Sequence, residues 1–462
     1  MEEKVTKSQE LFQNKSVWSA IFSMAVPSCI SILVIFFYNM ADMFFIGQLG
    51  DTAQVAAVSI VGPVFSLITA VSTMLGVGGC SVIAKTTGEG KLKESKSYAS
   101  LCFYAAVFLG ITCMVILLVC TDGILGLLGA NEEILPYARS YMRILAVGAV
   151  MMLLPHVLGA VIRADGGIKE GLIGNLMGTV INIILDPIFI LVLHMGVSGA
   201  AFATVIGNAA SNIIYIWYIV KKAESLSIKP MLAIYSPLML IHILAVGLPN
   251  GISSLLSGFA STFSNQLLSE YGTDAIAAMA AAGKATMIIA MVQMGICMGV
   301  QPLMAYNYGA GNVERLKEIL KKLGLLTFVL GSAAMLGCLF GRKALIGMFL
   351  KNVRAASMGE ELVLFLVIAS PVIGLYYLST NFLQASGNAM TATVVSLLRQ
   401  GIILIPSLFL MNSLIGFKGI AAAHTIADIL SVAVALTACF RQYNILKQKM
   451  AGEKRSLQTF ID

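Results

Sequence analysis

Long apolar runs, separated by short polar breaks, cover most of this chain. A bilayer core about 30 Å thick needs about 20 consecutive apolar residues per helix, and these runs reach that length. The pattern predicts twelve membrane-spanning helices, over residues 17–46, 53–86, 95–121, 134–162, 169–193, 198–220, 237–268, 275–307, 316–341, 358–384, 389–413 and 418–440.

The composition agrees with a membrane protein, because 58% of the 462 residues are hydrophobic and only 11% are charged. A soluble domain carries about 25% charged residues, so a water-soluble enzyme, a disordered chain, a coiled coil and collagen are excluded. The eight cysteines form no CxxC pair, so neither a zinc site nor a disulfide framework is indicated. The predicted fold class is an all-α polytopic membrane protein.

Lysine and arginine are distributed unequally between the two sides of the predicted membrane domain. One side, which includes both ends of the chain, carries 21 of them, and the other side carries seven. The positive-inside rule places the richer side in the cytoplasm, which also explains the net charge of +7 without nucleic acid. We therefore expect a cytoplasmic N-terminal tail (1–16), a cytoplasmic linker (223–236) and a cytoplasmic C-terminal tail (441–462).

The chain is similar to itself at an offset of 220 to 222 residues. The offset holds in four separate segments and predicts two parallel six-helix repeats, an N-lobe (17–222) and a C-lobe (237–440). Parallel repeats around a central cavity are typical of secondary transporters, in which two bundles rock around a central site. A duplicated scaffold or channel without moving parts is the alternative. Pro27, inside the first predicted helix, is a candidate hinge. Matched pairs include Pro27 and Pro249, Gly78 and Gly299, Gly90 and Gly311, Gly166 and Gly387, and Gly196 and Gly416.

Two aspartates, Asp42 and Asp186, lie inside predicted helices of the N-lobe, where no lysine or arginine stands at matching depth. Carboxylates near the bilayer centre are costly and need a compensating charge. Asn182 lies four residues before Asp186 on the same helical face, and Thr204 and Asn208 follow on the next helix. These oxygen ligands suit a proton or a hard cation such as Na⁺ and do not suit zinc or copper.

The C-lobe has a different set of embedded charges, namely Asp428, Arg399 and Lys284. An ion pair between Arg399 and Asp428 is one interpretation. A role in the cavity is the other, because His424 lies four residues before Asp428 on the same face.

The repeat offset shows that the candidate cation ligands are absent from the C-lobe. This difference predicts one cation site per chain, in the N-lobe. The equivalent positions are Asp42 and Ser264, Asn182 and Ile403, Asp186 and Ser407, and Thr204 and His424.

The chain resembles the multidrug and toxic compound extrusion (MATE) family of cation-coupled efflux transporters over essentially its full length. The resemblance rests on the stretch VPSCISILVIFFYNMADMFFIGQLGDTAQVAAVS, on QPLMAYNYGAGN and on the duplicated twelve-helix plan. In one branch of that family, an aspartate on the first helix cooperates with Asn-x-x-x-Asp on the fifth and a threonine on the sixth. Asp42, Asn182, Asp186 and Thr204 match that pattern.

The resemblance extends to residues around this site. Tyr38 and Tyr141 match tyrosines that line the same region, and His156 stands where the family pattern has an asparagine. The branch with an acidic site on the seventh and tenth helices is not matched.

The resemblance implies an antiporter, not an enzyme, that exports amphipathic or cationic organic compounds in exchange for H⁺ or Na⁺. No cofactor or nucleic acid is expected, and the partners are small organic substrates and the lipid bilayer. We expect a multi-pass monomer of the cell membrane with both termini in the cytoplasm. The alternative is a flippase for a lipid-linked saccharide or another amphipathic lipid. That function would need a cationic cavity, whereas both embedded N-lobe charges are acidic.

Overall fold

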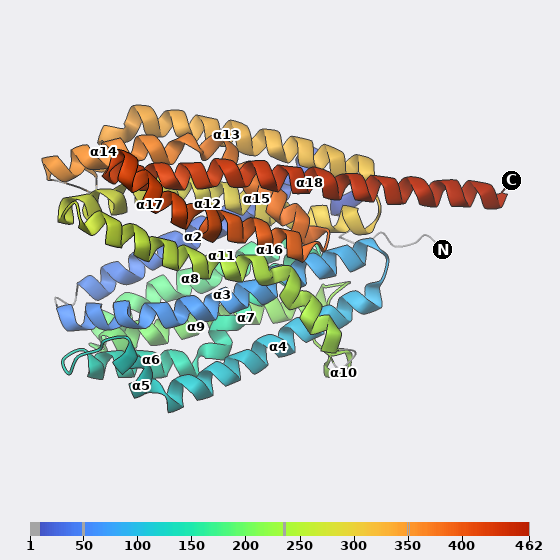
Figure 1. Cartoon of the computed structure of the whole chain (residues 1–462). Coiled ribbons are helices and arrows are strands. Elements are labelled where there is room, and N and C mark those ends of the chain that lie inside the picture. Colours follow the sequence, from blue (N-terminus) through green and yellow to red (C-terminus); the bar gives the residue numbers. More distant parts are fainter. Residues whose placement is uncertain (1–9, 49–50, 234–236, 349, 351, 462) are drawn as a thin grey trace. The chain divides into compact units, whose positions relative to one another are not determined.

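The computed structural model describes residues 10–48, 51–233, 237–348, 350 and 352–461, and all regular structure within them is helical (Figure 1). The first repeat begins after a short π-helical turn, η1 (Glu10–Asn14). Its helices are α2 (Val17–Gly47), α3 (Thr52–Gly88), α4 (Leu92–Val119), α5 (Thr121–Leu127), α6 (Leu135–Val147), α7 (Ala149–Ala164), α8 (Ile168–Pro187) with the π-helical η2 (Ile188–Val192), and α9 (Val197–Lys221).

The second repeat follows the short helix α10 (Pro230–Ala233) in the linker. Its helices are α11 (Pro237–Ser269), α12 (Thr273–Gly309), α13 (Val313–Gly347), α14 (Val353–Ile368), α15 (Ser370–Ala385), α16 (Ala389–Leu397) with the π-helical η3 (Leu398–Ile403), α17 (Leu404–Ile415), and α18 (Phe417–Ile461). The helix α18 continues well past residue 440, where the sequence predicted a tail, and it reaches the C-terminal end in Figure 1.

Among the described residues, ten helices are long and apolar enough to cross a membrane, and the number reaches twelve when two bent pairs each count as one span. The bent pairs are α6 with α7, at 53°, and α14 with α15, at 47°. The breaks fall at Gly148 and Ala369, which are equivalent under the repeat offset. The twelve segments predicted from hydrophobicity therefore correspond to these spans, with two of them bent.

Glycines with a left-handed backbone recur at equivalent turns of the two repeats. Gly196 (φ 57°) precedes α9, and Gly416 (φ 64°) precedes α18. An L-residue with a side chain adopts this conformation only with strain, so glycine is required there. The pairs Gly90 and Gly311, and Gly166 and Gly387, show the same agreement.

Each repeat has a buried apolar core, and large apolar side chains also cover its outside. In the first repeat, Met142, Leu145 and Leu153 pack with residues of α3 and α9. On the outside, Phe108 is 70% exposed, and in the second repeat Phe340 is 88% exposed. Exposed apolar surface on this scale needs an apolar surrounding, which the lipid bilayer provides.

Candidate functional site

The candidate site is assembled from four helices of the first repeat. Helix α2 carries Tyr38 and Asp42, helix α8 carries Asn182 and Asp186, helix α9 carries Thr204, and helix α6 carries Tyr141. Each pair on α2 and α8 is four residues apart, so its two side chains lie on one helical face. Asp42 and Asp186 are close enough to interact electrostatically, and both also interact with the two tyrosines. The structure therefore brings together the four predicted ligands and both predicted tyrosines.

Thr204 is the point at which three of these helices meet. Its hydroxyl lies 3.3 Å from the Tyr38 hydroxyl of α2, and it accepts a hydrogen bond of 3.4 Å from the Asn182 side-chain amide of α8. Because the amide nitrogen of Asn182 is directed at Thr204, its Oδ1 is left as an acceptor.

Asp186 is fully buried, at 0% exposure, and neither of its carboxylate oxygens has a hydrogen-bond partner among the described residues. The same is true of Asn182 Oδ1 and of Asp42 Oδ1, which are also buried atoms. Buried acceptors are normally paired, since an unpaired one costs free energy. The site thus presents four acceptor oxygens, which a shared proton or a cation would satisfy.

Close packing of α8 against α9 holds this arrangement in place. A Cβ added at Gly207 would lie 2.6 Å from the Gly178 carbonyl oxygen and 3.0 Å from Asn182 Cβ. One turn after Gly207 on α9, the Ser211 hydroxyl donates a hydrogen bond of 2.8 Å to the Gly174 carbonyl oxygen of α8. The Tyr215 hydroxyl also donates a hydrogen bond to a backbone carbonyl of α8. Small residues that let two backbones approach, together with hydrogen bonds between helices, are the usual means of packing helices in membranes.

Asp186 lies where regular helical hydrogen bonding ends. Pro187 follows it and has no N–H to donate, and the π-helical η2 begins at the next residue. Short π-helical segments of this kind often occur at functional sites.

A protein-family model named MatE matches this chain twice, over residues 27–188 and 249–410. The two matches have the same length and are offset by the repeat distance, so they confirm the duplication. The chain belongs to the MatE family.

Relatives and solved structures agree with this membership. The chain is 31% identical over 425 residues to the multidrug export protein MepA of Staphylococcus aureus (strain N315), covering 92% of this chain and 94% of MepA. It is 28% identical over 446 residues to MepA of Staphylococcus saprophyticus, covering 96% and 98%.

The fold is that of solved MATE structures at 24% identity. A MATE in the bent conformation superposes with a TM-score of 0.91 over 97% of this chain and all of that chain. A transporter from Pyrococcus furiosus superposes with a TM-score of 0.89 over 96% of this chain. The chain is thus a multi-pass membrane transporter of the MATE family and not an enzyme.

Two further residues that the sequence associated with the N-lobe site of this MATE transporter lie on α7 and α9. His156 lies on an exposed face of α7, whereas its neighbours Leu154 and Val157 are buried. The side-chain amide of Asn208 donates a hydrogen bond of 2.8 Å to the backbone carbonyl of Thr204, one turn earlier on α9. With this bond, the amide nitrogen of Asn208 caps a backbone carbonyl of its own helix directly at Thr204.

The predicted C-lobe residues form a separate cluster. The Arg399 guanidinium, in η3, lies 2.7 Å from an Asp428 carboxylate oxygen, as the ion-pair interpretation predicted. The guanidinium also lies over the rings of Tyr376 and Tyr377, at 4.7 and 5.6 Å. His424 contacts the Ser264 hydroxyl at 3.5 Å. The Asp428 carboxylate is therefore paired with a cationic side chain, whereas Asp42 and Asp186 have no such pair among the described residues.

The side chains of the N-lobe site are oxygen ligands. Among the residues that the structure describes, no group of three or more His, Cys, Asp or Glu side chains could hold a metal ion. The site offers two carboxylates, one amide oxygen and hydroxyl groups, which are ligands for hard cations. The glycines that set the spacing of α8 and α9 were not recognised from the sequence, although their recurrence on both helices is a usable signal.

Proposed function

We propose that this protein exports amphipathic or cationic organic compounds from the cell, in exchange for H⁺ or Na⁺, by alternating access. The multidrug export activity named for its MepA relatives supports the substrate class. The observation that carries the proposed coupling is the fully buried Asp186, with both carboxylate oxygens unpaired beside Asp42.

The coupling cation would bind between α2 and α8. Two carboxylates in a low-dielectric site repel each other, so the site is stable only when a proton or a cation is present. A proton would sit on one carboxylate and be shared with the other or with Asn182 Oδ1. A sodium ion would take the same oxygens, with the hydroxyl of Thr204 as a further ligand.

Cation binding would then pull α2 toward α8 and change the shape of the N-lobe. A bend of α2 near Pro27 would lower the affinity for the bound compound and release it outside. Cation and compound need only bind the two states with different affinity, because differential affinity moves the equilibrium. One charge moving through about 150 mV contributes roughly 3.5 kcal/mol, enough for roughly a few hundredfold accumulation of a neutral compound.

Efflux of a fluorescent cationic dye from proteoliposomes tests this function, with a pH gradient and a sodium gradient imposed separately. We expect one gradient to drive the dye in the wild type and neither to drive it in D42N or D186N. D122N is the matched control, because Asp122 lies on the surface and pairs with Arg139.

Normal efflux in D42N and D186N would contradict the site. A wild-type protein that responds to neither gradient would contradict the coupled export of such dyes and favour the lipid flippase.

A further inference from the structure

The first helix of each repeat is divided between two compact units. One unit contains Ile30–Gly247, and the other contains Lys15–Cys29 together with Leu248–Asp462. The leading part of α2 therefore packs with the second repeat, and the leading part of α11 packs with the first. Pro27 and Pro249, which are equivalent under the repeat offset, each lie within two residues of the point where the helix changes unit.

Each exchanged half-helix is held by backbone contact at a glycine. A Cβ added at Gly78 of α3 would lie 2.0 Å from the Ile243 carbonyl oxygen and 3.0 Å from the Gly247 nitrogen of α11. Gly299 of α12 is the equivalent glycine of the second repeat. A Cβ added there would lie 2.5 Å from Ser28 Oγ and 2.9 Å from the Met24 carbonyl oxygen of α2. In both cases the glycine contacts two residues that are four positions apart on the other helix. The two helix contacts therefore have the same arrangement.

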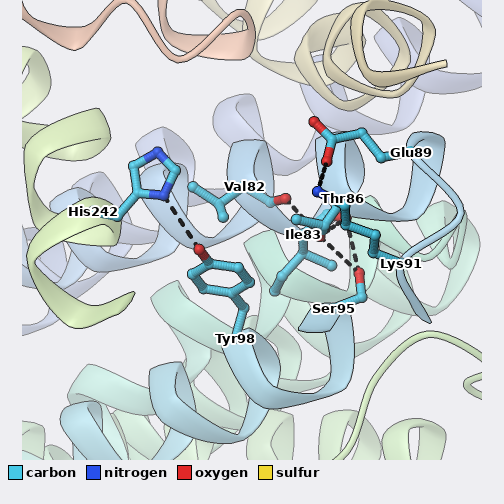
Figure 2. Close-up of polar contacts among 8 residues, drawn as sticks. All are labelled: Val82, Ile83, Thr86, Glu89, Lys91, Ser95, Tyr98 and His242. Atoms are coloured by element: carbon cyan, nitrogen blue, oxygen red, sulfur yellow. Dashed lines mark hydrogen bonds and ion pairs between the residues drawn. The ribbon is translucent and has the colours of Figure 1, made fainter. Parts of the chain in front are cut away.

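Polar contacts that involve partly exposed groups reinforce these surfaces. The Tyr98 hydroxyl of α4 lies 3.2 Å from His242 Nδ1 on the exchanged part of α11 (Figure 2). Ser95, one turn before Tyr98, bonds Thr86 at 3.1 Å and the Ile83 carbonyl at 3.0 Å, which fixes α4 on α3. His242 itself is exposed, so its bond to Tyr98 can exchange with water.

The second exchanged half-helix is held in a similar way. The Lys322 ammonium lies 5.5 Å above the Trp18 ring, and the Arg315 guanidinium donates 2.6 Å to the Lys15 carbonyl oxygen.

Buried polar atoms without partners occur at the same place in both helices. Ser28 Oγ follows Pro27, and Asn250 Nδ2 follows Pro249, and neither atom has a hydrogen-bond partner among the described residues. Both positions are equivalent under the repeat offset. An unpaired buried group destabilises the packed state, and separation of the helices would let water reach it. The packing that holds the exchanged half-helices is thus poised to open.

We propose that the exchanged half-helices form the gate on the lysine- and arginine-rich side of the transporter. The inference rests on the alternating access proposed above. If the two sequence repeats are the bodies that rock, the contacts at Gly78 and Gly299 join one repeat to the other and must break in every cycle. Gly78 and Gly299 permit the close approach in the closed state, because a Cβ at either position would require its neighbours to shift.

A reversible cross-link tests the gate directly. In S28C/G299C, with Cys29 and Cys297 replaced by alanine, the two Cβ atoms start 2.7 Å apart, and a small shift gives the roughly 3.8 Å of a disulfide. Oxidation should abolish dye efflux from proteoliposomes, and a reductant should restore it.

The matched control is T327C/G374C in the same background. It joins α13 to α15, two helices of one repeat, at a Cβ separation of 2.5 Å. Because this disulfide lies within one repeat, we expect it to leave dye efflux unchanged. Mass spectrometry verifies that positions 28 and 299 are linked. Normal efflux of the linked protein would overturn the gate, because the leading half of α2 would then stay packed on α12 during transport.

A measurement that does not depend on transport separates failure of the gate from failure of the proposed function. Ser28 is only 8% exposed, so a cysteine in S28C should react with a water-soluble maleimide only when the gate opens. We expect alkylation of S28C in the intact protein under a gradient that drives transport. If S28C is never alkylated under any gradient, the gate is refuted, whether or not the dye is a substrate.

Discussion

The side-chain amide of Asn182 donates to the hydroxyl of Thr204, 3.4 Å away on the neighbouring helix. The bond is long and therefore weak, but it orients the amide. With the nitrogen directed at Thr204, Asn182 Oδ1 is left as a buried acceptor without a partner among the described residues, as are both carboxylate oxygens of Asp186. A helix-to-helix contact thereby leaves an amide oxygen available to the proposed coupling cation.

Removing that oxygen should weaken cation binding. In N182A the apparent affinity for the coupling ion should fall roughly tenfold, about 1.4 kcal/mol, as expected for one lost bond to a charged group. The dependence of dye efflux on cation concentration measures it. N208A makes the same change one turn beyond Thr204, where the side chain bonds its own helix. An equal loss in both variants would mean that Asn182 has no special role.

The spacing of α8 and α9 should be equally sensitive. In G207A the new Cβ would lie 2.6 Å from the Gly178 carbonyl oxygen, so the helices must separate. Overpacking of this kind costs about 1–3 kcal/mol of stability. We expect a lower midpoint of thermal unfolding in detergent, together with weaker cation coupling. G258A is the control, because nothing lies within 4 Å of the Cβ it adds. Equal thermal stability of the two variants would contradict the close packing.

The C-lobe ion pair should stabilise the protein without coupling it to a cation. D428N leaves the Arg399 charge without its carboxylate, and we expect a loss of about 1–3 kcal/mol. This is less than for a fully buried pair, because the two side chains are 16% and 21% exposed. The thermal midpoint should fall while the cation dependence of efflux stays at the wild-type value. Loss of cation dependence in D428N would place a coupling group in the C-lobe.

Asp165 should fix the start of the linker between the repeats. Its buried carboxylate accepts hydrogen bonds from the Tyr218 hydroxyl (2.9 Å) and the Ser225 backbone N–H (2.8 Å), and from the Ser225 hydroxyl. In D165A these donors lose their acceptor, so the Ser225 amide should exchange with deuterium much faster than in the wild type. Hydrogen exchange read by mass spectrometry over 222–229 measures this. Unchanged protection of that segment would show that other contacts hold the linker.

Hydrophobicity alone predicted the helices, because a helix that spans lipid must carry a long apolar run. It did not predict the bends at Gly148 and Ala369, which do not interrupt those runs. It also missed the continuation of α18 to Ile461, since a polar helix outside the membrane has no apolar pattern.

The features of the site that depend on one helix at a time could be predicted from the sequence. Asp42 and Asp186 stand out as embedded charges, and the spacing of Asn182 from Asp186 places both on one face. The orientation of a side chain depends on its neighbours in three dimensions, which is why the supporting roles of Asn208 and His156 stay predictions. The ion pair of Arg399 with Asp428 was one of two interpretations, and the 2.7 Å contact confirms that pair, while a role of His424 and Asp428 in the cavity stays a prediction.

Direct cation binding to the purified protein tests whether Asp186 and its neighbours hold the coupling ion. Equilibrium binding of ²²Na⁺, and proton uptake in weakly buffered solution, can be measured on the wild type and on D186N without any transport. We predict that one of the two cations binds at one per chain and that this binding is lost in D186N. Wild-type binding in D186N would contradict the account, because the coupling site would then lie elsewhere.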